Sequence, residues 1–71
     1  MLKVNIKQEV IEKFLVKKNK SQNWLAMKLE ISSGYMSQLL LGIRHPSPKI
    51  REKILNVMPD LKFDDIFKIE K

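Results

Sequence analysis

The sequence contains no cysteine, and it has only two glycines, three prolines, one tryptophan and one tyrosine. Without cysteine, neither a disulfide nor a thiolate metal site can brace the fold. No apolar run reaches the roughly 18 residues that a membrane-spanning helix needs. The first residues, Met-Leu-Lys-Val-Asn, also lack the apolar segment of a signal peptide. We therefore expect a cytoplasmic protein with no membrane partner.

Side chains suited to catalysis are equally scarce. His45 is the single histidine, and the acidic residues are scattered outside the middle of the chain. These residues form no metal cluster, no nucleophile with a base and no carboxylate pair that could run a reaction. A chain of 71 residues is expected to be one small domain with little room for an enclosed pocket. We expect no enzyme, metal, cofactor or small-molecule ligand.

The net charge of +6 is concentrated in one part of the chain. Between residues 13 and 51 there are eight cationic side chains and one acid, Glu30, which makes this segment +7. A concentrated positive charge favours a polyanionic partner such as nucleic acid. The lysines between 13 and 20 also suit a solvated helix face, with a distant phosphate contact as the alternative.

Apolar spacing predicts five helices, over residues 6–18, 22–29, 33–41, 48–58 and 64–68. Several polar residues are placed to begin or end them. We expect the starts at Asn5 with Gln8, at Ser21, Ser32 and Asp64, and at Ser47 with Pro48, and the ends at Asn19 and Gly42.

The two ends of the chain alternate apolar and polar residues. Residues 1–5 are expected to form an arm or a short strand, and residues 67–70 show the same alternation. The ends can therefore pair as a small two-stranded ribbon, or remain separate.

Residues 21–42 have the pattern of two short helices joined by a tight turn, a helix-turn-helix. Ala26 is small enough for a close helix crossing, and Ile31 supplies an apolar plug in the turn. On the second helix, one stripe is apolar and the opposite face is polar or bare. The apolar stripe is Met36, Leu39 and Leu40, and the open face is Ser33, Gly34, Ser37 and Gln38.

This open face has the chemistry to read bases in a DNA major groove. A glutamine amide can bind adenine through two hydrogen bonds, and a serine hydroxyl can donate or accept. A glycine lets the backbone approach closely. Gln38 is the strongest candidate for sequence specificity, with Ser33, Gly34 and Ser37 beside it.

These residues resemble the phage Cro and repressor type of helix-turn-helix, also called the xenobiotic-response-element type. The similarity spans about residues 7–67 and is carried by Ser21-Gln22, Leu25-Ala26, Ile31-Ser32, Gly34 to Leu39, Gly42, Arg44, Pro46-Ser47 and Asp65-Ile66-Phe67. It implies a compact, all-α, five-helix bundle like that of lambda repressor, with base readers on the second helix of the pair. Phosphate contacts are expected from Gln22, Asn23, Ser32, Tyr35 and Arg44; packing of its ring on neighbours is the alternative role of Tyr35.

The sequence departs from that family at four positions. Glu30 stands in the turn where the family usually has glycine, at a place suited to a positive φ. Trp24, Leu41 and Ile43 replace polar or basic residues, so together they are candidates for an apolar protein interface.

Two functions remain from the sequence. The first is a transcription regulator, expected to be a repressor, that binds an operator in double-stranded DNA as a homodimer. The alternative is a protein-interaction module, similar to an antitoxin, an antirepressor or an immunity partner, that uses Trp24, Leu41 and Ile43.

Overall fold

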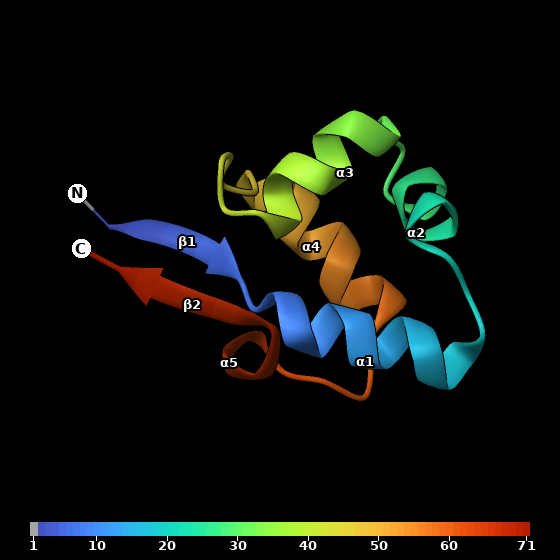
Figure 1. The fold of residues 1–71 in the computed structure, drawn as a ribbon. Coiled ribbons are helices and arrows are strands. Elements are labelled where there is room, and N and C mark those ends of the chain that lie inside the picture. The colour runs from blue at the N-terminus through green and yellow to red at the C-terminus, as the bar shows by residue number, and fades with distance from the viewer. Residues whose placement is uncertain (1) are drawn as a thin grey trace.

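The computed structural model describes residues 2–71, so Met1 of the expected arm lies outside the described residues. The elements follow in the order β1 (Lys3–Ile6), α1 (Gln8–Lys18), α2 (Gln22–Lys28), α3 (Ser33–Leu40), α4 (Pro48–Val57), α5 (Phe63–Ile66) and β2 (Phe67–Glu70). Figure 1 shows the helices gathered into one body, from which the two terminal strands project as a ribbon. None of the helices within residues 2–71 has the length and apolarity to cross a membrane.

Serine side chains begin three of the helices, as predicted. The Oγ atoms of Ser21 and Ser32 accept hydrogen bonds from backbone N–H groups three residues later, at 3.0 and 3.1 Å. Ser47 does the same at the start of α4, at 3.3 Å, and Pro48 occupies the first turn. Each bond satisfies a backbone donor that has no partner inside its helix.

Three successive helices end at a residue with positive φ. Asn19 after α1 has φ 56°, Glu30 after α2 has φ 59°, and Gly42 after α3 has φ 79°. In each case the following N–H turns back to an earlier carbonyl; for example, the Ile31 N–H donates to the Ala26 carbonyl at 3.0 Å. This pairing satisfies the last carbonyls of a helix when its chain leaves through the left-handed region. The predicted ends at Asn19 and Gly42 are confirmed.

The predicted start of the first helix is wrong. Ile6 belongs to β1, and α1 begins at Gln8 after Lys7, which makes no side-chain cap. Asn5, expected to cap the helix, instead lies opposite Lys68 in the ribbon, and its side chain bonds Glu70 and His45. Pairing with a distant strand has therefore overridden the local capping preference of Asn5.

The last helix also differs from its prediction. It begins one residue earlier than expected, after Lys62, and Asp64 lies inside it. Asp65 stabilises its start by accepting from the Lys62 N–H at 2.8 Å. It ends at Ile66 because Phe67 already belongs to β2.

The terminal ribbon is present, so the fold is mainly helical with a small sheet and is not all-α. The strands are antiparallel, with Val4 opposite Ile69 and Ile6 opposite Phe67. Ile6 and Phe67 are buried at the base of the ribbon, whereas Ile69 near its tip is 53% exposed. Burial of that one apolar pair fixes the register, because a slip by one residue would turn both side chains to solvent.

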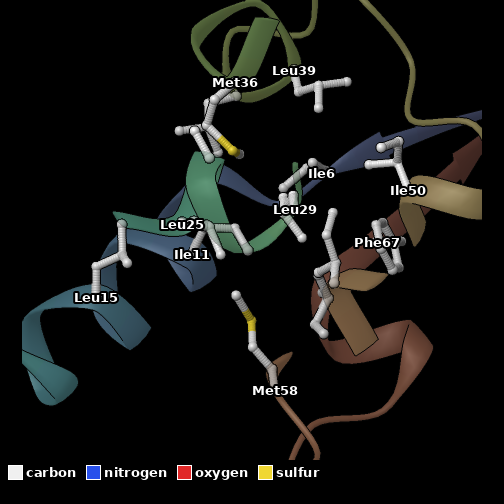
Figure 2. Packing of buried hydrophobic residues seen from close by; sticks show 14 residues of the cluster. Ile6, Ile11, Leu15, Leu25, Leu29, Met36, Leu39, Ile50, Met58 and Phe67 are labelled. Atoms are coloured by element: carbon white, nitrogen blue, oxygen red, sulfur yellow. The ribbon is translucent and has the colours of Figure 1, made fainter. Parts of the chain in front are cut away.

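One apolar core joins the helices to the base of the ribbon (Figure 2). Leu29, Met36, Leu39, Ile54 and Ile66 are completely buried within it. Fourteen residues from every helix and both strands form this cluster: Ile6, Ile11, Leu15, Leu25, Ala26, Leu29, Met36, Leu39, Leu40, Ile50, Ile54, Met58, Ile66 and Phe67. The core therefore holds α3 by one side only and leaves its other side free.

Candidate nucleic-acid interface

The pair α2 and α3 is held together by the apolar residues that the sequence assigned to it. Leu25, Ala26 and Leu29 of the first helix and its cap are buried, as are Met36 and Leu39 of the second. Ala26 is 3% exposed, so its small side chain faces the packed interior. The turn between the helices spans only Leu29 to Ser32.

Glu30 adopts the left-handed conformation in this turn without glycine's freedom. Its carboxylate pairs with Lys53 of α4 at 3.2 Å, and the same ammonium group donates to the Leu29 carbonyl at 3.4 Å. One lysine therefore contacts both the side chain and the backbone of the turn. The ion pair links the turn to α4, although its exposed position limits its contribution to the free energy of unfolding.

The open face of α3 carries the four residues expected to read bases. Ser33 and Gly34 are exposed at its first turn, and Ser37 and Gln38 are half-buried one turn later. A side chain built at Gly34 would meet no atom within 4 Å. The backbone there is therefore bare and accessible to a groove. The structure places these four residues on one side of the helix, opposite Met36 and Leu39.

Gln22 at the start of α2 is joined to Ser37 of α3. Its Nε2 donates to the Ser37 Oγ at 2.9 Å in a partly buried contact. The sequence predicted Gln22 as a phosphate ligand and Ser37 as a base reader, but it did not indicate that the two side chains are in contact. Because a hydroxyl that accepts a bond still has its own hydrogen, Ser37 can donate outward while Gln22 holds it.

Arg44 contacts two other candidate residues. Its Nε–H donates to Oε1 of Gln38 at 2.5 Å, and its guanidinium lies 5.6 Å from the centroid of the Tyr35 ring. A guanidinium over an aromatic face is attracted by the ring quadrupole. The remaining N–H donors of Arg44 stay available to an anion. The arginine expected to contact phosphate therefore also holds the side chain expected to read a base.

Asn23 and Ser32 occupy the starts of the two helices. Asn23 is exposed in the first turn of α2. Ser32 is exposed as well, and its Oγ accepts from the Tyr35 N–H while its own hydrogen remains free to donate. Both side chains are thus placed where a helix N-terminus favours an anion.

The three apolar candidates for a protein interface are not gathered into one surface. Trp24 is half-buried on α2, with Lys20 and Lys28 at 5.6 and 5.8 Å from its ring centroid. Leu41 and Ile43, at 65% and 66% exposure, follow the last turn of α3. Figure 1 shows α2 and the loop after α3 at opposite ends of α3. Trp24 therefore lies between two cations, apart from the other two residues.

Ligands for a metal ion do not come together in the part of the chain that the structure describes. Within residues 2–71, no group of three or more histidine or acidic side chains is placed to hold one. The candidate site consists of neutral hydrogen-bonding groups on α3, with the cationic Arg44 after its C-terminal end.

Comparison with known proteins assigns this arrangement to a family. Over 65 residues, the chain is 31% identical to the uncharacterized HTH-type transcriptional regulator YvzC of Bacillus subtilis (strain 168). The matched segment covers 92% of this chain and 83% of that protein. No family model matches the chain, and no solved structure does. The capped pair of helices and this similarity lead to the same conclusion: the chain belongs to the HTH-type transcriptional regulators.

Proposed function

We propose that the protein binds double-stranded DNA in a sequence-specific manner by placing α3 in the major groove. The observation that carries the proposal is the open face of α3, where Ser33, Gly34, Ser37 and Gln38 lie together and away from the core. An α-helix fits the major groove, and hydroxyl and amide groups can bond base edges there. Gln38 is the principal reader.

Phosphate contacts orient the helix on the duplex in this proposal. Ser32 and Tyr35 lie at the start of α3, Gln22 and Asn23 lie at the start of α2, and Arg44 follows the C-terminal end of α3. Contacts to the DNA phosphates on both sides of a groove fix the register of the recognition helix, although these contacts do not themselves distinguish base sequences. The local charge of residues 13–51 adds attraction to any DNA.

The regulator acts, in this proposal, as a cytoplasmic repressor of the Cro and repressor type. Occupation of an operator by so small a body blocks other proteins and needs no further contact surface. The active form is a homodimer, because one helix reads only a few base pairs and two-fold proteins match two-fold operators. No enzymatic step or cofactor enters this mechanism.

Selection of bound sequences from random DNA at physiological salt tests the proposal. Enrichment of a two-fold motif with half-sites about one helical turn apart is the expected result. Titration at several salt concentrations should then give a log-log slope of about −0.9 for each phosphate that is neutralised. Recovery of no motif at any salt concentration would refute sequence-specific binding.

The second candidate is a protein-interaction module, which is favoured by the exposure of Leu41 and Ile43 at 65% and 66%. Such large apolar side chains are costly to leave in water if nothing covers them. The affinity of a protein partner bound through these side chains would change little with salt concentration, whereas the affinity for DNA phosphates would fall steeply. The same salt titration therefore separates the two functions. Trp24 plays no part in this second surface, because it lies at the other end of α3.

A further inference from the structure

A groove lies between α1 and the connection from α4 to α5, away from the residues proposed to bind DNA. Its volume is about 570 Å³, within the range of roughly 300 to 1,000 Å³ that is usual for small-ligand sites. It is lined by residues 9–18 of α1 and by residues 57–61, none of them from α2 or α3. Figure 1 shows α1 and this connection on one side of α4 and α3 on the other.

The wall of the groove is apolar and incompletely covered. Val10, Phe14, Val57 and Leu61 all line it and remain half-buried, and the last three also pack against the core. In a domain with so small a core, each of these side chains could be shielded further by an apolar ligand. The gain would come from removal of their exposed carbon atoms from water.

One rim of the groove is cationic. Lys13, Lys17 and Lys18 line it from α1, and all three are exposed. Glu9 and Asp60 line it as well, but within residues 2–71 the structure forms one ion pair, which joins Lys53 to Glu30. The three ammonium groups thus have no carboxylate at ion-pair distance, and the lining carries a net positive charge.

We propose that this groove binds a small amphipathic anion, with its apolar body on the wall and its carboxylate or other anionic head at the lysine rim. A cationic amphiphile would meet three lysines against two carboxylates, and an anion without an apolar body would leave the wall in water. Nucleic acid is a poor fit because its phosphates gain nothing from an apolar wall. The ligand and the DNA would occupy different surfaces, so this site stands whether or not α3 reads DNA.

Titration of the full chain with sodium octanoate, followed by amide chemical shifts in NMR, tests the assignment. Shifts should change at residues that line the groove and stay constant along α3 and the ribbon. Octylammonium, which has the same body and the opposite charge, should bind at least about fivefold more weakly. Equal responses to the two probes, or changes spread over the whole chain, would overturn the proposal.

Two variants, compared with a control, separate the role of the rim from that of the wall. Lys13→Gln with Lys17→Gln should weaken octanoate binding about fivefold, because each exposed ion pair contributes little alone. Lys68→Gln, on the ribbon, removes a charge elsewhere and should leave binding unchanged. Leu61→Ser should weaken both probes through loss of apolar contact. An octanoate affinity unaffected by the double lysine variant would overturn the anion site even if the Leu61 variant fails to fold.

Discussion

Arg44 donates its Nε–H to Oε1 of Gln38 at 2.5 Å, which ties the cation after α3 to the proposed base reader. The amide nitrogen of Gln38 keeps both hydrogens, and its oxygen keeps a second lone pair. A bond to adenine through both amide atoms therefore remains available. Arg44 is thus expected to affect which base is read as well as how tightly phosphate is held.

The first prediction concerns Gln38→Ala. Removal of the amide should relax specificity at about one base pair, at a cost of roughly 1 to 3 kcal/mol for the preferred sequence. Affinities for four duplexes that differ at that pair provide the measurement. A loss of affinity that is equal for all four duplexes would show that Gln38 is not a reader.

The second prediction compares Arg44→Lys with Arg44→Ala. Lysine keeps the positive charge but lacks the Nε–H that holds Gln38, so it should retain affinity for non-specific DNA and lose discrimination at the Gln38 base pair. Alanine should lose both. In a background of Gln38→Ala, the effect of Arg44→Lys on discrimination should vanish. If Arg44→Lys discriminated as well as the parent protein, Arg44 would be a phosphate contact only.

Local chemistry was enough to predict much of the fold. The serine caps and the helix ends at Asn19 and Gly42 depend on groups a few residues apart, so they can be recognised in the sequence. The start of α1 could not be predicted in this way. Asn5 is a good cap, but its backbone pairs with β2, more than sixty residues further along the chain.

The candidate site shows the same division. The open face of α3 follows from helical periodicity, which places Ser33 and Ser37 on one side. The bonds from Gln22 to Ser37 and from Arg44 to Gln38 depend on how α2 and the loop pack against α3. The groove beside α1 escaped prediction because the apolar spacing of Val10 and Phe14 is also typical of ordinary core residues.

The third prediction concerns strain at Glu30. A residue other than glycine at φ 59° has a steric cost of about 1 kcal/mol. The exposed ion pair with Lys53 stabilises the fold by less than that amount. Glu30→Gly should therefore be slightly more stable than the parent. Glu30→Ala loses the pair and keeps the strain, so it should be about 1 kcal/mol less stable than the glycine variant. Urea denaturation measures both, and the reverse order of stability would contradict the expected strain.

The fourth prediction concerns the contact between Gln22 and Ser37. A partly buried hydrogen bond of 2.9 Å is expected to contribute about 0.5 to 1 kcal/mol to the free energy of unfolding. A double-mutant cycle with Gln22→Ala and Ser37→Ala isolates that coupling. Asn23→Ala, one residue along α2 and exposed, serves as the control and should show no coupling to Ser37→Ala. A coupling near zero for the Gln22 pair would mean that the contact does not hold the two helices together.

The last prediction separates the two apolar residues of β2. Phe67 is 2% exposed and its ring centroid lies 4.9 Å from that of Phe63, whereas Ile69 is 53% exposed on the same strand. Phe67→Ala should cost about 3 to 5 kcal/mol, a large share of the total stability of so small a domain. Ile69→Ala should cost about 0.5 kcal/mol or less. Thermal unfolding of the two variants gives the comparison. Equal losses would mean that the ribbon is held along its whole length and not at its base, because the buried pair of Ile6 and Phe67 would then contribute no more than the exposed tip.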